Sequence, residues 1–274
     1  MSRLYTRRVM QVFVILPAAG LGTRMAGPQP KSSNDPGSSS HPSAVAPPRY
    51  TDGKDPLSGP PPKQFLSLDG VPILIHSLRA FAAVGRVTAI YVAVRRTEME
   101  RVQAQIAEFG FTDRVHVVEG GDTRQESVLH ALNAVPASSD DVVLVHDAVR
   151  PLIDTATIDR TIDAVMEHDA AIVGLPAIDT IKQVERTAHG AIITSTIPRE
   201  FIVQAQTPQG FRFGLLQNAM TDAMAEGFLG TDEASVIERA GVPVAVVYGS
   251  QVNLKITQPG DLELAEFYLH QRNR

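Results

Sequence analysis

The fold is decided by residues 11–25, which read Gln11-Val12-Phe13-Val14-Ile15-Leu16-Pro17-Ala18-Ala19-Gly20-Leu21-Gly22-Thr23-Arg24-Met25. The apolar run from Val12 to Leu16 predicts a buried β-strand, and the small residues after it predict a tight loop. Residues without large side chains let backbone N–H groups come close to an anion. Arg24 adds a planar cation that suits phosphate oxygens. The segment therefore predicts a strand that runs into a phosphate-binding loop.

This loop lacks the features of two better-known phosphate fingerprints. Met25 stands where a dinucleotide fingerprint has its third glycine, and no Gly-Lys-Ser/Thr follows as in a P-loop. A nicotinamide cofactor or an ATPase is therefore not indicated. Taken alone, the two glycines favour an ordinary tight turn with a solvated arginine, so other parts of the chain must decide.

The N-terminus offers a competing interpretation of the first strand. Arg3, Arg7 and Arg8 before an apolar run are typical of a secretory signal. The run is short for such a signal, and a glycine loop with an arginine follows at once, so a buried strand explains these residues better. No segment approaches the ~20 apolar residues of a membrane span.

Composition limits the classes of protein. The 274 residues are 43% hydrophobic and 20% charged, which is ordinary for a globular protein with a substantial core. The chain has no cysteine, which excludes a disulfide scaffold, thiolate metal sites and a cysteine nucleophile. We expect a cytoplasmic protein, because this composition fits a reducing compartment. The net charge of −5 argues against broad nucleic-acid binding.

Strands and helices alternate through most of the chain. The first five predicted strands are Gln11–Leu16, Thr88–Val94, Arg114–Val118, Asp141–Val145 and Ala170–Leu175. The helices between them are Pro72–Val84, Glu98–Phe109, Arg124–Asn133 and Thr155–His168. This order predicts a doubly wound, mostly parallel α/β sheet of the Rossmann-like type, in a single domain over residues 10–274.

The last part of the chain continues the mixture of elements. It predicts helices near Phe213–Ala225 and Asp232–Arg239, strands at Val242–Tyr248 and Val252–Ile256, and a final helix from Pro259.

Two segments interrupt the alternation. Residues 26–62 hold ten of the nineteen prolines and predict a flexible insertion; a surface loop is favoured over a proline-rich arm that binds a partner. Within residues 176–207, Ile181–Glu185 and Ala191–Thr196 flank a glycine turn and predict a β-hairpin. A two-stranded ribbon needs a surface to lie on, either the chain's own body or a partner subunit.

Polar residues follow several predicted strands. They occur in Glu119–Ser127, in His146–Pro151 and in Asn253–Lys255. A doubly wound sheet binds its ligands at the carboxyl ends of its strands. Asp122 could simply cap the helix that follows it. His146 has no second histidine at a metal-ligand spacing and is interpreted as structural.

Eight short segments, in order, carry a resemblance to a known family. They are residues 17–25, Pro62-Lys63-Gln64-Phe65, Gly120-Gly121-Asp122-Thr123-Arg124, residues 145–151, Asp179-Thr180, Thr207-Pro208-Gln209, Thr231-Asp232-Glu233-Ala234-Ser235 and Asn253-Leu254-Lys255. The sequence resembles the 2-C-methyl-D-erythritol 4-phosphate cytidylyltransferases of the non-mevalonate isoprenoid pathway. This resemblance implies transfer of CMP from CTP to the polyol phosphate, with release of pyrophosphate.

The resemblance also implies roles for individual residues. The residues implied to act in catalysis are Arg24 and Lys63 on the triphosphate and Arg199 and Lys255 on the acceptor phosphate. The residues implied to hold the nucleotide are Ala18, Ala19, Gly20, Gly22, Gly121, Asp122 and Ser127. Thr180, Thr207 and Arg150 are implied to assist at the acceptor, and Asp147 to lie near the phosphates and Mg²⁺. The hairpin, with Thr180 and Arg199, is implied to reach the neighbouring subunit of a homodimer.

The insertion is the departure from the family pattern, because it separates Arg24 from Lys63. Lys31 also follows a proline and is a rival for the same role. Lys63 is favoured because Gln64-Phe65 and a strand-like Leu66–Leu68 follow it. Two other functions remain open: a cytidylyltransferase for ribitol 5-phosphate, and a non-catalytic nucleotide-binding module.

Overall fold

The computed structural model describes residues 9–20, 62–188 and 190–272. Gly22, Arg24, Lys31 and the predicted insertion as far as residue 61 lie outside the described residues. Within the described ranges no helix is long and apolar enough to cross a membrane.

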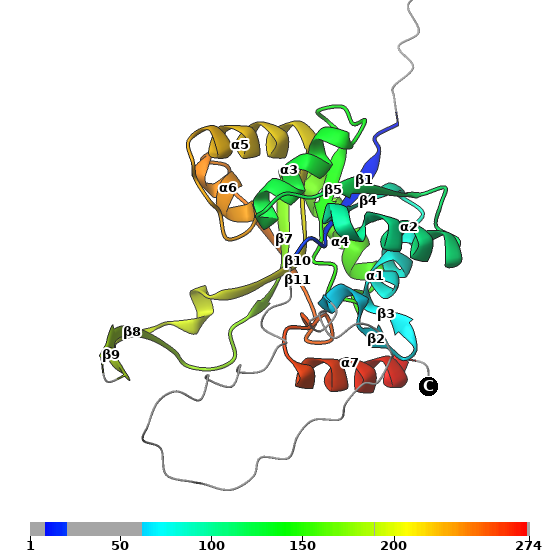
Figure 1. Cartoon of the computed structure of the whole chain (residues 1–274). Coiled ribbons are helices and arrows are strands. Elements are labelled where there is room, and N and C mark those ends of the chain that lie inside the picture. Colours follow the sequence, from blue (N-terminus) through cyan, green and yellow to red (C-terminus); the bar gives the residue numbers. More distant parts are fainter. Residues whose placement is uncertain (1–8, 21–61, 189, 273–274) are drawn as a thin grey trace, which may run out of the picture.

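A seven-stranded sheet forms the centre of the molecule (Figure 1). Its strands, in spatial order, are β11 (Ala245–Tyr248), β7 (Ala170–Pro176), β10 (Val203–Arg212), β6 (Val142–Val145), β1 (Val12–Pro17), β4 (Val87–Val94) and β5 (Val115–Glu119). The pairs β6–β1, β1–β4, β4–β5 and β7–β11 are parallel, whereas β10 is antiparallel to both of its neighbours. The α/β class and the mostly parallel sheet are confirmed.

Helices cover both faces of the sheet, and β1 shows why. Val12, Val14 and Leu16 pack with α1 (Ile73–Ala82), α2 (Met99–Glu108) and α4 (Thr155–His168). The alternate residues Phe13 and Ile15 pack with α3 (Arg124–Ala134), α5 (Phe213–Ala225) and α6 (Glu233–Arg239). Because successive side chains of a strand point to opposite faces, an apolar run is required where both faces are buried.

Two predictions about the strands were wrong. Residues 203–212 form β10, a long strand of the main sheet for which no strand was predicted. Val252–Ile256 is not a strand but a loop. Its polar backbone groups bond to side chains and loops instead of a neighbouring strand: Arg150 donates to the carbonyl of Asn253, and Ile256 N–H donates to that of Val149.

The predicted hairpin is present as β8 (Ile181–Thr187) and β9 (Gly190–Ile197). It projects away from the sheet and its helices (Figure 1). We call residues 177–202 the arm. Large apolar side chains of the arm are open to solvent, with Ile192 63% and Phe201 81% exposed.

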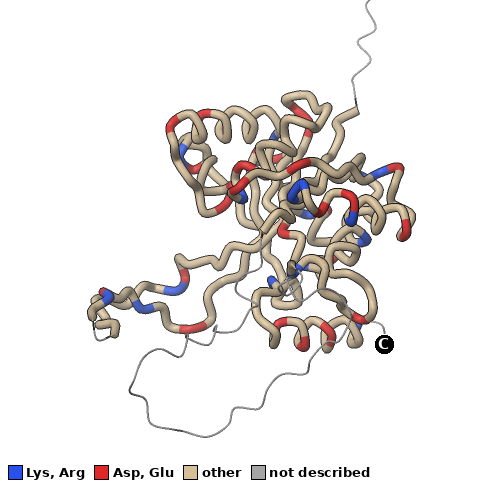
Figure 2. Tube along the Cα trace, viewed as in Figure 1, with Lys and Arg blue, Asp and Glu red and all other residues tan. Residues whose placement is uncertain are grey.

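Four short or C-terminal elements contribute to the side of the molecule that holds the loop before the C-terminal helix. A 3-10 turn, η2 (Lys63–Phe65), precedes the short pair β2 (Ser67–Leu68) and β3 (Val71–Pro72). The C-terminal helix α7 (Pro259–Arg272) packs near this pair through a small apolar cluster that includes Leu68, Ile256 and Ala265. Lys, Arg, Asp and Glu are interspersed over the described chain (Figure 2).

Candidate active site

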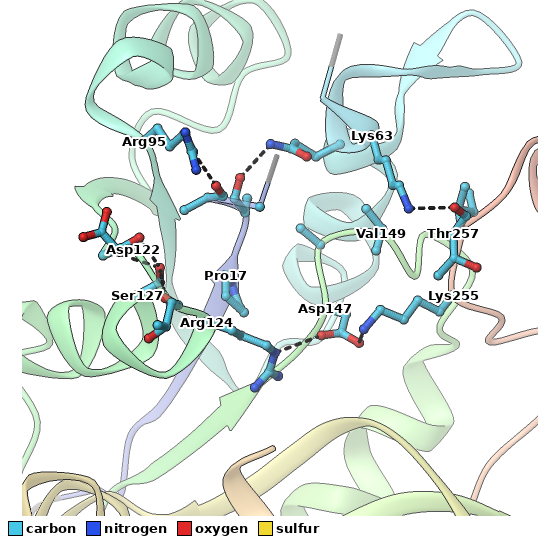
Figure 3. A pocket seen from close by; sticks show the side chains of 18 residues that line it. Pro17, Lys63, Arg95, Asp122, Arg124, Ser127, Asp147, Val149, Lys255 and Thr257 are labelled. Carbon is cyan, nitrogen blue, oxygen red and sulfur yellow. Dashed lines mark hydrogen bonds and ion pairs between the residues drawn. The ribbon is translucent and has the colours of Figure 1, made fainter. Parts of the chain in front are cut away.

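A cavity of ≈ 380 Å³ opens at the carboxyl ends of β1, β4, β5 and β6 (Figure 3). These strands are parallel neighbours, so the residues that follow them converge at one edge of the sheet. The wall also receives η2 and the loop before α7. The cations that line it are Lys63, Arg95, Arg124 and Lys255, and the carboxylates are Asp122 and Asp147. The excess of positive charge suits an anionic ligand.

The loop after β1 is held by its carbonyl oxygens. Gln64 Nε2 donates to the carbonyl of Ala18 at 2.6 Å, and Arg95 Nε donates to that of Ala19 at 2.8 Å (Figure 3). In a trans peptide the N–H points opposite to the C=O. The N–H groups of Ala19 and Gly20 have no hydrogen-bond partner in the described part of the chain. Clamping the carbonyls therefore presents these two donors to an anion.

The opposite wall is the start of α3. Thr123 is its N-cap: its side chain accepts from Glu126 N–H, and the Glu126 carboxylate accepts from Thr123 N–H at 2.8 Å. The alternative role for Asp122 as this cap was wrong, which leaves its side chain at the cavity. Ser127 Oγ accepts from the N–H of Gly121 at 3.0 Å and so ties the glycine turn to the helix.

Asp147, two residues after the end of β6, contacts three cations, of which Figure 3 shows Arg124 and Lys255. Lys255 Nζ lies 2.9 Å and Arg150 Nε 3.3 Å from Oδ2, and Arg124 Nε lies 3.4 Å from Oδ1. Burial opposes ionisation of this carboxyl, but Arg124, Lys255 and Arg150 outweigh it and hold the pKa of Asp147 well below its usual range. Asp147 therefore organises the cations rather than acting as a proton donor.

Arg124 also joins this cluster to α6. Its Nη1 lies 2.6 Å from Oε1 of Glu233, which is only 1% exposed. Burial lowers the pKa of a guanidinium, but the charges of Glu233 and Asp147 outweigh it and raise the pKa of Arg124. Arg124 is thus fixed in its charged form between two carboxylates.

A second opening of ≈ 210 Å³ adjoins the cavity on the far side of Arg124, Asp147 and Lys255. Arg150, Thr207 and Gln209 are among the residues that line it. The Thr207 hydroxyl accepts a hydrogen bond from Asp147 N–H at 3.1 Å. The cations around Asp147 therefore stand between two adjoining compartments, as two anionic substrates would require.

The comparisons with known proteins identify the family. The family model for 2-C-methyl-D-erythritol 4-phosphate cytidylyltransferase matches residues 54–271, which is more than half of the chain. The chain belongs to this family. It is therefore related to nucleotidyltransferases rather than to nucleotide-binding scaffolds.

Individual relatives of the cytidylyltransferase family agree. A 2-C-methyl-D-erythritol 4-phosphate cytidylyltransferase of Acidobacterium capsulatum is 62% identical over 96% of this chain and 99% of its own. That of Solibacter usitatus is 44% identical over 96% and 97%. The crystal structure of the Francisella tularensis enzyme has a TM-score of 0.67 at 30% identity, covering 94% of this chain and 99% of its own.

Several family-implied residues meet at the cavities and others do not. Those that line one or both openings are Ala18, Ala19, Gly20, Lys63, Gly121, Asp122, Ser127, Asp147, Arg150, Thr207 and Lys255. Thr180 and Arg199 lie on the arm and line neither opening, and Arg199 donates instead to the carbonyl of Ile178. Gly22 and Arg24 lie outside the described residues.

The sequence-based assignment gave no role to several polar contributors to this cytidylyltransferase site, among them Gln64, Arg95, Arg124 and Glu233. Arg95 directly follows the β4 strand, so a cation at a strand end was the available signal. Arg124 and Glu233 stood inside quoted motifs but received no role. No spacing rule connects them, because they are 109 positions apart.

Mg²⁺ fits the site only as an ion that arrives with phosphates. Among the described residues no group of three His, Asp or Glu side chains forms a metal site. Both oxygens of Asp147 are already engaged by cations. Mg²⁺ commonly binds through one or two carboxylates together with substrate phosphates and water. Asp122 and Asp147 are the carboxylates of the described residues that line the cavity, and a phosphate-bound Mg²⁺ would contact one of them.

Proposed function

We propose that this protein transfers CMP from CTP to 2-C-methyl-D-erythritol 4-phosphate and releases pyrophosphate. The observation that carries the proposal is the cluster of Lys255, Arg150 and Arg124 on Asp147, placed between two openings at the carboxyl ends of the central strands. Membership of the cytidylyltransferase family supports the choice of substrates.

The residues present suit a displacement at phosphorus. An oxygen of the acceptor phosphate attacks the α-phosphorus of CTP in line, the bond to the bridging oxygen breaks, and pyrophosphate leaves. A phosphate monoester is already anionic near neutral pH, so the protein need not supply a nucleophile. Positioning two anions and spreading the transition-state charge is the catalytic task. Lys63, Arg24 and Lys255 are proposed to carry it.

A coupled pyrophosphate assay tests the function. Purified protein with CTP is supplied with 2-C-methyl-D-erythritol 4-phosphate, with ribitol 5-phosphate, or with no acceptor. Rapid release with the first acceptor alone is expected. Release with ribitol 5-phosphate would support the alternative acceptor, whereas CTP binding without release in any mixture would support a non-catalytic module.

We propose that Mg²⁺ accompanies the triphosphate and contacts Asp147. The bound ion would supply charge neutralisation on the phosphates. Activity should then require added Mg²⁺, and Asp147→Asn should raise the Mg²⁺ concentration needed for half-maximal rate. An unchanged Mg²⁺ dependence in this variant would remove Asp147 as a ligand.

We propose a homodimer in which the arm of one subunit reaches the cavity of its partner, and a cytoplasmic location. Exposed apolar residues such as Ile192 and Phe201 support the first, as does the position of Arg199 away from its own chain's cavity. The lack of cysteine fits the second.

A further inference from the structure

The loop between β11 and α7 carries one cation of the cavity wall and contacts a second. Lys255 belongs to this loop, and the Thr257 carbonyl accepts a hydrogen bond of 2.7 Å from Lys63 Nζ (Figure 3). Lys63 comes from η2, 194 positions earlier, and is 8% exposed. The orientation of the Thr257 carbonyl therefore affects the orientation of the Lys63 ammonium group.

Asp261 holds the peptide unit that contains this carbonyl, through the N–H group on its opposite side. Its Oδ2 accepts three hydrogen bonds: from Thr257 N–H at 2.7 Å, from Thr257 Oγ1 at 2.7 Å and from Gln258 N–H at 2.8 Å. The Gln258 N–H and the Thr257 C=O belong to the same peptide unit and point in opposite directions. Holding the N–H on Asp261 thus aims the C=O toward Lys63.

The charges along this path support each other. Burial opposes ionisation of Asp261, but the hydrogen bonds from Thr257 and Gln258 and the charge of Lys63 outweigh it and lower the pKa of Asp261. A carboxylate on the N–H side of a peptide strengthens its carbonyl as an acceptor for an ammonium on the other side. Asp261 is the third residue of α7, where an acidic side chain can reach back to N–H groups ahead of the helix.

We propose that Asp261 is a positioning residue that orients Lys63 through the Thr257–Gln258 peptide; this rests on the proposed function, in which Lys63 acts on the triphosphate. Anchoring one N–H of an ammonium restricts the directions of the others. Asp261 does not itself line the cavity, so it acts through the loop, in which Thr257 is a lining residue.

The experiment measures kcat and KM for pyrophosphate release in Asp261→Ala and Asp261→Asn. We expect Asp261→Ala to lower kcat about tenfold at nearly unchanged KM for the acceptor, because positioning is lost rather than binding. Asp261→Asn keeps an oxygen acceptor in place and should lose less. Glu263→Gln is the matched control: it removes one negative charge from the same helix start at an exposed side chain, and its kcat should stay at the wild-type value.

A double-mutant cycle separates positioning from helix stability. Asp261→Ala also removes a cap from α7, so a lower Tm is expected whatever its effect on Lys63. In a Lys63→Met background, Asp261→Ala should cause no further loss of kcat. If the two losses multiply instead, the positioning role is overturned. If Asp261→Ala does not fold, the same cycle is run with Asp261→Asn.

The outcomes distinguish a failure of the positioning role of Asp261 from a failure of the proposed function. A wild-type protein that releases no pyrophosphate with any acceptor overturns the proposed function. A wild-type protein that turns over, together with Asp261 variants of unchanged kcat, overturns only the positioning role.

Discussion

At the scale of single residues, Gln64 and Arg95 hold the loop after β1 by its carbonyl oxygens. This arrangement lets a loop with few polar side chains present its N–H groups to an anion. Gln64 Nε2 donates to the carbonyl of Ala18, and Arg95 Nε donates to that of Ala19. The N–H groups of the same two peptide units are then directed away from these side chains. The direction of the N–H groups of Ala19 and Gly20 therefore depends on side chains from two other elements.

Arg95→Met tests this clamp. The variant keeps a long apolar stem but loses the bond to the Ala19 carbonyl, so we expect KM for CTP to rise about tenfold, the worth of roughly one well-placed hydrogen bond. Arg96→Met is the matched control, because Arg96 is adjacent and exposed and does not line the cavity. Equal KM values for the two variants would show that the clamp does not bear on CTP.

Lys63 is tested by truncation alongside its rival. Removing a preorganised cation of this kind typically costs about a hundredfold in kcat, so we expect that loss in Lys63→Ala with the fold intact. Lys31→Ala should keep the wild-type rate. Steady-state pyrophosphate release and a circular dichroism spectrum measure both, and the reverse pattern would assign the role to Lys31.

His146 is a structural residue, and its buried position predicts that the free energy of unfolding depends on pH. It is fully buried, with its Nδ1 3.0 Å from Thr207 Oγ1 and its Nε2 3.1 Å from the Arg150 carbonyl. Burial lowers its pKa from 6.5 to about 4. Between these two pH values the His146 imidazole is protonated in the unfolded chain but neutral in the folded protein. The free energy of unfolding therefore falls as the pH falls.

The expected loss from this one group is about 2 kcal/mol between about pH 7 and pH 5. Urea unfolding at both pH values measures it. The variant His146→Gln should lose the part of the pH dependence that His146 causes, whatever its own stability. A variant as pH-sensitive as the wild type would mean that other groups carry the effect.

At the scale of elements, the start of α3 is a tightly packed part of the cavity wall. A Cβ at Gly121 would lie 2.3 Å from Glu126 Cβ and 3.2 Å from the Glu126 carbonyl carbon. Neither atom is the far end of a flexible side chain, so the capping box itself would have to move. The glycine is needed for close approach of the turn to the helix.

Gly121→Ala should therefore weaken CTP binding and lower the free energy of unfolding by about 1–3 kcal/mol, the usual cost of overpacking. Gly85→Ala is the control, since a Cβ there meets nothing within 4 Å. Calorimetric titration with CTP and thermal unfolding measure the two effects. Similar results for both alanines would contradict the role given to the capping box.

At the scale of the whole molecule, the proposed dimer makes a prediction that depends on which subunit supplies Arg199. In a mixed dimer of Lys63→Ala and Arg199→Ala chains, sharing of sites between subunits creates one intact site and one doubly defective site. If each chain supplied its own Arg199, both sites would be defective.

Denaturing and refolding the two variants together should therefore restore about a quarter of the wild-type activity, the statistical yield of intact sites in a random two-fold assembly. Each variant refolded alone is the control and should stay near its own low rate. No recovery in the mixture, with dimers confirmed by light scattering, would place Arg199 in its own chain's site.

Features that depend on neighbouring residues could be predicted from the sequence, whereas features that depend on contacts between distant residues could not. The strand β1, its loop and the helices around it were predicted, because apolar runs and small residues act over a few positions. β10 was missed, because its residues hold no apolar run and include Pro208 and Gly210, two residue types that are depleted in strands. The loop at 252–256 has the apolar residues of a strand, but no neighbouring strand pairs with it.

The sequence by itself determined the α/β class, the first strand and the family, because each depends on residue types at short spacings. Only the tertiary structure decided what holds the loop and the cations in place. Arg95 on Ala19, Glu233 on Arg124, and Asp261 acting on Lys63 through a peptide unit all join residues that are distant in the chain. Such contacts depend on how the elements pack, and no local pattern encodes them.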